Sequence, residues 1–309
     1  MTEPARGLRL GTRASALAVR QAEWVSAELS ARFPGLRFEI TRIKTSGDRM
    51  QARSLADVGG KGLFVKEIEE ALRGGSIDVG VHSMKDLPAT LAPGLGIAAV
   101  PRREDAHDVL IARSSAGLAG LAPGARVGTS SLRRGAFIRH LRSDLTVVAM
   151  RGNVDTRIAK WRAGEVDAIV LADAGLRRLG LAVPEAQRLT TDEMLPAIGQ
   201  GALAIEARRD GRGWALASVL ECANARDAVS AERSFLAGMG GDCTTPIAAH
   251  ATVSEETLRL EAAVGDPEGR RLLRGSRHGA RADAETIGRS LADELLALGG
   301  REILRGLGQ

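Results

Sequence analysis

The sequence is poor in cysteine. Its 309 residues include only two, Cys222 and Cys243. Two cysteines without nearby histidine pairs are too few for a disulfide framework or for a structural zinc site. We therefore expect a fold without structural metal, stabilised by its apolar cores.

Aromatic residues are also scarce, at 3% of the chain with no tyrosine at all. Proteins that bind single-stranded nucleic acid stack bases on aromatic side chains, and few are present for that purpose. The chain carries 43 Lys and Arg against 38 Asp and Glu, a net charge of +5, and the two signs are interspersed. We expect no nucleic-acid partner. The many arginines either reflect overall composition or bind carboxylate and phosphate groups, and only their placement separates these alternatives.

Long apolar runs are missing as well. No stretch approaches the roughly 18 residues that a membrane span needs. The N-terminal residues MTEPARGLRL show no basic start followed by an apolar segment and a small-residue cleavage site. We therefore expect a cytoplasmic protein without a membrane partner.

What the chain does contain is an alternation of strand-like and helix-like segments, with 44% hydrophobic residues to form cores. This alternation predicts α/β architecture with crossover helices on mainly parallel sheets. From about residue 222 one helix candidate is followed by three strand candidates and a last helix, which predicts a smaller α+β unit. The strand candidates are 8–10, 37–43, 77–81, 96–100, 109–112, 146–149, 168–171, 203–207, 247–253, 258–264 and 272–277, and the helix candidates are 16–32, 65–73, 132–141, 154–163, 173–179, 226–237 and 284–298.

The segment VHSMKDLP, residues 81–88, directly follows one of these short apolar strands. Polar clusters at the ends of strands are where α/β proteins place their chemistry. His82, Ser83, Lys85 and Asp86 supply a proton donor, a hydroxyl, an ammonium and a carboxylate, and Pro88 prevents a helix from running through them. The segment is either a functional loop or a solvated turn with an incidental ion pair.

Three strand-to-helix junctions share one layout, in which small or hydroxyl residues and an arginine precede a helix. They are LRLGTRASAL, VGTSSLRRG and VVAMRGNVDTR. Ser15, Ser130 or Ser131, and Asn153 are candidate N-caps. Because a helix N-terminus offers free backbone N–H groups and a positive potential, an added arginine makes an anion site. Three such sites indicate a ligand with several anionic groups.

Two glycine-rich segments predict backbone freedom. The run Gly59–Gly62 carries Lys61 and precedes a helix, so it is either a lid or an ordinary flexible loop. The segment 196–202, PAIGQGA, suits a hinge or a tight crossing between domains.

Cys243 lies in the loop GMGGDCTTP, ahead of a strand candidate. A cysteine at such a place is a nucleophile, a covalent anchor or an apolar filler, and the loop favours one of the first two. Cys222, within a helix-like segment, is interpreted as packing.

Taken together, these segments resemble porphobilinogen deaminase, a family also called hydroxymethylbilane synthase. The resemblance runs through RLGTRASALAVRQAE, KTSGDR, GGKGLFVKEIE, DVGVHSMKDLP, VGTSSLRRGAFI, RGNVDTRIAKW, AGLRRLGL, LPAIGQGALAIE and the Cys243 loop. It implies two α/β lobes like those of periplasmic binding proteins and a smaller C-terminal α+β domain. The implied domains are residues 1–102 plus about 199–219 for the first lobe, 103–198 for the second and 220–309 for the domain with the cysteine.

The resemblance also implies an activity, a cofactor and site residues. The family joins four porphobilinogen molecules head to tail with loss of ammonia, giving linear hydroxymethylbilane for porphyrin, heme and other tetrapyrrole biosynthesis. A dipyrromethane cofactor is implied, covalently attached to Cys243, with Asp86 as the catalytic carboxylate and a monomeric enzyme. The residues matching the family's positions for binding the cofactor, the substrate and the growing polypyrrole chain are Arg13, Ser15, Lys61, Ser83, Lys85, Thr129, Ser130, Ser131, Arg133, Arg134, Arg151, Arg157 and Arg178.

One departure and one alternative accompany this interpretation. Asp242 stands where the family usually has a second glycine before the cysteine, and Ala248 stands where a glycine is common. A carboxylate close to the thiol would raise its pKa. The alternative is a two-lobed anion-binding module without catalysis, which would need no anchoring cysteine.

Overall fold

The structure, a computed structural model, describes residues 7–46, 65–114, 116–240 and 245–306. Its contacts divide the chain into two compact units, of which the first comprises Met1–Arg103 and Ala202–Arg226, and the second Glu104–Gly201 and Asp227–Gln309. Among the helices within these described ranges, none is long and apolar enough to cross a membrane.

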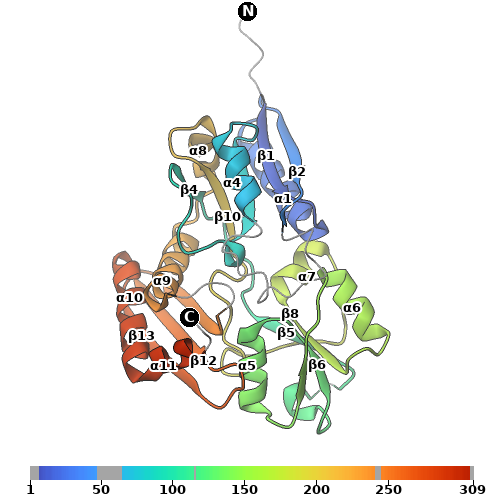
Figure 1. Ribbon diagram of the computed structural model, residues 1–309. Helices are drawn as coiled ribbons and strands as arrows, with labels where there is room; N and C mark the ends of the chain where they lie inside the picture. The colour runs from blue at the N-terminus through green and yellow to red at the C-terminus, as the bar shows by residue number, and fades with distance from the viewer. Residues whose placement is uncertain (1–6, 47–64, 115, 241–244, 307–309) are drawn as a thin grey trace, which may run out of the picture. The chain divides into compact units, whose positions relative to one another are not determined.

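The first unit is built on a five-stranded sheet in the order β2-β1-β3-β10-β4 (Figure 1). Strands β1, β2 and β3 are parallel, whereas β10 is antiparallel to both of its neighbours. The elements are β1 (Leu8–Arg13), α1 (Ala16–Arg32), β2 (Phe38–Ile43), α4 (Lys66–Arg73), β3 (Val79–Ser83), the 3₁₀ turn η1 (Met84–Asp86), β4 (Leu95–Ala99), β10 (Leu203–Arg208), α8 (Arg212–Ala217) and the 3₁₀ turn η3 (Ser218–Leu220).

Helices cover both faces of this sheet. Val25 and Leu29 of α1 belong to the same buried cluster as Ala217 at the end of α8. Ile68 and Leu72 of α4 belong to a separate cluster. The central strands of the sheet are therefore buried on two sides, and β3 and β4 have correspondingly apolar sequences.

The second unit contains a five-stranded sheet in the order β7-β6-β8-β5-β9. Strands β6, β7 and β8 are parallel, and β5 is antiparallel to β8 and β9. Its α5 contributes Phe137 to one buried cluster, while α6 contributes Trp161 to another. The elements are β5 (Asp108–Ala112), the 3₁₀ turn η2 (Leu118–Gly120), β6 (Arg126–Gly128), α5 (Leu132–Leu141), β7 (Thr146–Val148), α6 (Val154–Arg162), β8 (Ala168–Ala172), α7 (Asp173–Leu179) and β9 (Ala186–Arg188).

The two five-stranded sheets have the same plan. In each, four strands run in one direction and one strand, β10 or β5, is inserted the opposite way at the fourth position. The chain leaves the first sheet after β4, enters the second through β5 and returns through β10. The predicted fold class of two α/β lobes with mainly parallel sheets is confirmed.

The C-terminal part of the second unit is a three-stranded antiparallel sheet, β11-β12-β13, with helices packed on it (Figure 1). Phe235 of α9, Leu260 of β12 and Leu291 of α10 are fully buried in one core. This confirms the predicted smaller α+β part. Its elements are α9 (Ala223–Met239), β11 (Ile247–Ser254), β12 (Thr257–Gly265), β13 (Leu272–Ala280), the 3₁₀ turn η4 (Arg281–Asp283), α10 (Ala284–Leu295), η5 (Leu296–Gly300) and α11 (Arg301–Arg305).

Most element predictions are confirmed to within two residues, but five are corrected. The three-residue strands β6 and β9 and the short helices α8 and α11 were not predicted. The last helix was predicted to continue to residue 298, whereas α10 ends at Leu295 and a wide turn follows, in which Gly299 has φ 113°. That conformation favours glycine and interrupts the helix.

The predicted caps are confirmed for two of three helices. The side-chain oxygens of Ser15 and Ser131 accept hydrogen bonds from the backbone nitrogens of Ala18 and Arg134, at 3.3 and 3.4 Å. Asn153 occupies the N-cap position of α6 without a side-chain cap bond. The boundaries of the three predicted domains stay a prediction.

Candidate active site

In the first unit, predicted site residues follow two parallel strands that are neighbours. Arg13 and Ser15 come at the end of β1, and Ser83, Lys85 and Asp86 come at the end of β3. Because the carboxyl ends of adjacent parallel strands meet at one edge of a sheet, these side chains lie close together. Four of the five predicted residues that the structure describes in this unit line one pocket, namely Arg13, Ser15, Ser83 and Asp86, and Lys85 lies next to Asp86 in η1.

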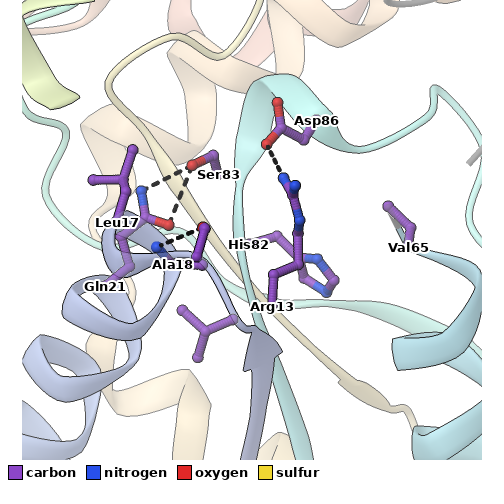
Figure 2. Close-up of a pocket in the computed structure, with 10 residues that line it drawn as sticks. Arg13, Leu17, Ala18, Gln21, Val65, His82, Ser83 and Asp86 are labelled. Carbon is purple, nitrogen blue, oxygen red and sulfur yellow. Dashed lines mark hydrogen bonds and ion pairs between the residues drawn. The ribbon is translucent and has the colours of Figure 1, made fainter. Parts of the chain in front are cut away.

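Asp86 faces Arg13 across this edge. The Asp86 Oδ2 atom lies 3.8 Å from Arg13 Nη1, and the two side chains are 36% and 22% exposed. Figure 2 shows the arginine side chain extending toward the carboxylate. Asp86 is carried by the 3₁₀ turn η1 and is partly exposed, so it can reach a ligand while it is held beside a cation.

A small pocket of about 50 Å³ adjoins this pair. Its polar lining comprises Arg13, Ser15, Gln21, His82, Ser83 and Asp86. The amide nitrogen of Gln21 donates a hydrogen bond to the Ser83 hydroxyl at 2.8 Å (Figure 2). The solvated-turn alternative for this segment is thus the poorer account, because its polar groups line a concave surface.

Gln21 was not predicted as a site residue. It is only 3% exposed and lies on the buried stripe of α1, with Ala18, Ala22 and Val25. A long polar side chain at an apolar helical position is the signal that could have identified it, because a buried polar group needs a partner.

In the second unit, predicted residues again follow parallel strands. Thr129, Ser130 and Ser131 come directly after β6, Arg151 comes after β7, and Arg178 lies on the helix after β8. Strands β6, β7 and β8 are parallel neighbours, so their carboxyl ends share one edge.

The three hydroxyl residues shape the N-terminus of α5. The Thr129 hydroxyl oxygen accepts a hydrogen bond from the Ser131 backbone nitrogen at 3.2 Å, and the Ser130 hydroxyl donates to the Met150 carbonyl at 2.9 Å. These bonds join the ends of β6 and β7 and aim the first turn of the helix at their shared edge.

Arg133 and Arg134 lie in that first turn, and both are buried. Each is paired with the buried carboxylate of Asp108, at 2.7 Å in both cases. Arg133 Nε has no hydrogen-bond partner within the part of the chain that the structure describes.

Arg157 adds a third cation to this edge. Its Nε donates to the Gly152 carbonyl at 2.8 Å. Burial, together with the neighbouring charges of Arg134 and Arg151, lowers the pKa of Arg157 from 12.5 to about 10. Burial is the largest cause of this shift, so Arg157 is a partly desolvated cation whose charge an anion placed beside it would compensate.

Arg178 contacts a different segment, the predicted hinge. Its Nη2 donates to the carbonyl of Gly201 at 2.7 Å, and burial lowers its pKa to about 10, against the opposing charge of Glu104. Gly199 and Gly201 have φ of 70° and 83°, so the predicted hinge segment contains two glycine-specific conformations. Lys61 and Cys243, with the predicted lid Gly59–Gly62 and with Asp242, lie outside the described residues.

The strand order and the two polar edges define a class: a two-lobed α/β protein with an ion-paired carboxylate at one sheet edge and clustered arginines at the other. Sequence comparison specifies the family. Residues 8–215 match the family model "Porphobilinogen deaminase, dipyromethane cofactor binding domain", and residues 227–297 match "Porphobilinogen deaminase, C-terminal domain". The chain belongs to the porphobilinogen deaminase family.

Relatives match over nearly the full length. The porphobilinogen deaminase of Syntrophotalea carbinolica is 50% identical over 301 residues, covering 97% of this chain and 96% of the relative. Those of Trichlorobacter lovleyi and Roseiflexus castenholzii are each 48% identical, covering 96% and 97% of this chain and 95% and 99% of the relatives. A periplasmic binding protein of Salmonella typhimurium is far more distant, at 15% identity and a TM-score of 0.41 over 70% of this chain and 92% of that one.

The described residues fit the family's cofactor by their chemistry. A dipyrromethane carries carboxylate arms, and the second unit offers Arg134, Arg151 and Arg157 together. Arg133 adds a buried donor, Nε, that has no hydrogen-bond partner among the residues that the structure describes. Guanidinium groups bind carboxylates through parallel N–H donors. The sheet edge of the second unit is therefore suited to holding such arms.

Proposed function

We propose that this chain is a transferase that joins four porphobilinogen molecules head to tail, releasing ammonia, to give linear hydroxymethylbilane. The observation that carries the proposal is the Asp86–Arg13 pair at the edge of the first sheet, in a chain that belongs to this family. A non-catalytic anion-binding module is not favoured, because the relatives that match 96–97% of the chain are named as deaminases.

Asp86 is the proposed catalytic residue. Departure of ammonia leaves positive charge on the substrate carbon, and the attacking pyrrole then carries positive charge on its nitrogen. A carboxylate beside these centres stabilises both and accepts or returns the N–H proton. Arg13, whose Nη1 lies 3.8 Å from Asp86 Oδ2, is proposed to orient the carboxylate at the pocket.

The arginines and hydroxyls are the proposed binding residues. Every porphobilinogen brings an acetate and a propionate, so the product gains carboxylates with each round. Arg134, Arg151 and Arg157 supply fixed cations at one sheet edge, supported by the first turn of α5. Ser83 and Lys85 supply a hydroxyl and an ammonium group at the other edge, beside Asp86.

The covalent dipyrromethane supplies a tethered pyrrole end to which the first substrate is joined. Cys243 is its proposed attachment point through a thioether, and Lys61 is a proposed binding residue for the cofactor and substrate. The three domains, with the boundaries given above, are likewise proposed. A monomeric state, a cytoplasmic location and the absence of nucleic-acid partners stay predictions.

Two measurements test this function. Purified protein incubated with porphobilinogen should release ammonia and form hydroxymethylbilane. The denatured protein, made in cells that synthesise porphobilinogen, should have an intact mass above that of the sequence by two linked pyrrole units. Cys243→Ser should lack this increment, and Cys222→Ser should keep it. Failure of the wild-type protein to consume porphobilinogen, together with a bare sequence mass, would contradict the proposal.

A further inference from the structure

Asp108, the first residue of β5, is a buried carboxylate that both arginines of α5 share. Its Oδ2 accepts a hydrogen bond from Arg133 Nη2 at 2.7 Å. Its Oδ1 accepts two from Arg134, from Nε at 3.1 Å and from Nη2 at 2.7 Å. The side chain of Asp108 is fully buried, and those of Arg133 and Arg134 are 4% and 8% exposed.

The Nη1 groups of both arginines donate hydrogen bonds to main-chain carbonyls. Arg133 Nη1 donates to the Leu195 carbonyl at 2.6 Å, and Arg134 Nη1 donates to the Val170 carbonyl at 2.9 Å. With both Nε and Nη2 on Asp108, the plane of the Arg134 guanidinium is set by the carboxylate. One negative charge faces two positive ones, so this buried group keeps a net positive charge.

Arg134 is also the member of this group that acts on the neighbouring cations. Its charge, together with that of Arg151, is among the causes that depress the pKa of Arg157. The guanidinium that Asp108 orients is therefore part of the cationic cluster at the carboxyl ends of β6 and β7. An anion bound there meets an arginine whose direction has already been fixed.

Gln200 ties the same carboxylate to another segment. Its amide nitrogen donates to Asp108 Oδ1 at 3.0 Å and to the Ala106 carbonyl at 2.7 Å. Gln200 is fully buried and lies between the two positive-φ glycines, Gly199 and Gly201. Gln200, in the predicted hinge segment, therefore helps to hold the Asp108 carboxylate that orients Arg134.

We infer that Asp108 is a positioning residue that holds the Arg134 guanidinium in the orientation that binds ligand carboxylates. This inference rests on the proposed function, because that function supplies the carboxylates. Asp108 itself is buried and contacts no substrate. Its contribution is preorganisation: an arginine that is already fixed loses little entropy when its ligand binds.

The first test compares two substitutions with a matched control. Asp108→Asn keeps the shape but places an amide N–H₂ against a guanidinium, and Asp108→Glu keeps the charge but displaces it by one methylene. The control is Asp105→Asn, a carboxylate three residues away that pairs with His107 at 2.6 Å. Both Asp108 variants should raise KM for porphobilinogen about tenfold and change kcat far less, whereas the control should leave both unchanged.

Asp108→Glu keeps a counter-charge for both guanidinium groups, so we expect it to fold. It is the deciding variant if Asp108→Asn is unfolded at the assay temperature. A wild-type KM in the folded Asp108→Glu variant would overturn the inference. So would a loss of kcat alone.

A double-mutant cycle tests whether Asp108 acts through Arg134. Arg134→Lys keeps a positive charge, but lysine has a single side-chain nitrogen and cannot replace the two arginine nitrogens that donate to Asp108 Oδ1. If Asp108 positions Arg134, Asp108→Asn should raise KM in the wild-type background and have less than a twofold effect in the Arg134→Lys background. Equal effects in the two backgrounds would show a general structural role and overturn the inference.

A readout without turnover separates this inference from the proposed function. Citrate, a tricarboxylate, should raise the unfolding temperature of the wild-type protein by binding the cationic cluster. The rise should be smaller for Asp108→Glu and unchanged for Asp105→Asn. A protein that shows this pattern but does not consume porphobilinogen would retain Asp108 as a positioning residue and lose the proposed function. Equal citrate shifts in all three proteins would overturn the inference even if turnover is normal.

Discussion

Asp86 and Arg13 face each other at 3.8 Å from the ends of two adjacent parallel strands. Neither residue is near the other in sequence; the pairing of β1 with β3 creates the relationship. The proposed catalytic carboxylate is thereby held at the carboxyl end of the first unit's sheet, in the turn that directly follows β3.

Replacement of this carboxylate should abolish turnover without unfolding the protein. Asp86→Asn should lower kcat by about 10²- to 10⁴-fold, the usual contribution of a positioned acid–base group. Asp86 is 36% exposed, so little packing is lost. Glu23→Gln, which removes an exposed carboxylate from α1, is the control and should leave kcat unchanged. An Asp86→Asn variant with near-normal kcat would remove this residue from its proposed role.

Loss of a clustered cation should weaken binding rather than chemistry. Arg157→Gln should raise KM for porphobilinogen about tenfold, because its guanidinium is a partly buried cation that an anion would compensate. The matched control is Arg113→Gln, which removes an exposed arginine stacked on Trp161 at 5.7 Å. If the two substitutions have equal effects on KM, the cluster around Arg157 does not bind the substrate.

The buried carboxylate of Asp108 predicts a specific acid sensitivity. Burial raises its pKa, but the charges of Arg133 and Arg134 and their hydrogen bonds outweigh this and lower the pKa from 3.8 to about 2. As the pH falls, the unfolded chain takes up the proton first. The stabilisation is therefore complete above pH 3.8 and is lost as the pH falls toward about 2.

Urea unfolding between pH 5 and pH 2 measures this effect. The unfolding free energy of the wild-type protein should lose about 2 kcal/mol across the window, a loss that Asp108→Asn should not show. Parallel pH profiles for the two proteins would contradict the assignment of this acid sensitivity to Asp108.

Gly201, in the predicted hinge segment, should be intolerant of substitution. Gly201 has φ 83°, and a Cβ atom there would lie 2.3 Å from the carbonyl oxygen of Glu104. Gly201→Ala therefore adds a steric clash to the conformational cost of about 1–2 kcal/mol. Gly124→Ala is the matched control, because Gly124 has φ 77° and open space around its Cβ position. Thermal unfolding should show a clearly larger loss for Gly201→Ala, and equal losses would mean that the backbone yields at Glu104.

The sequence predicted the long elements well because local signals define their ends. Ser131 caps a helix that begins at Leu132 as predicted, and Gly180 ends α7 in a left-handed conformation. Strand β6 was not predicted because its three residues include a single apolar side chain, that of Val127, whereas β7, which is equally short, has two adjacent valines. Its place in the sheet is set by β7 and β8, which pair with it from both sides.

The site was only partly predictable for a similar reason. Arg13 and Asp86 carried signals in their own segments, namely a strand end followed by a polar cluster. Asp108 carried no such signal, because it begins an apolar strand. Its hydrogen-bond partners, the two arginines of α5 and Gln200, are distant from it in sequence. Burial of a carboxylate between two arginines is a tertiary property, and no local pattern encodes it.

The antiparallel insertion of β10 has a consequence for biosynthesis. The first sheet lacks its fourth strand until residue 208 has been synthesised, whereas all five strands of the second sheet lie within residues 108–188. The second sheet can therefore assemble on the ribosome before the first is complete. Until then, β3 and β4 have no β10 between them, and the edge that carries Asp86 exposes unpaired backbone groups. Nascent chains stalled between residues 188 and 208 should thus be the ones that most need a chaperone.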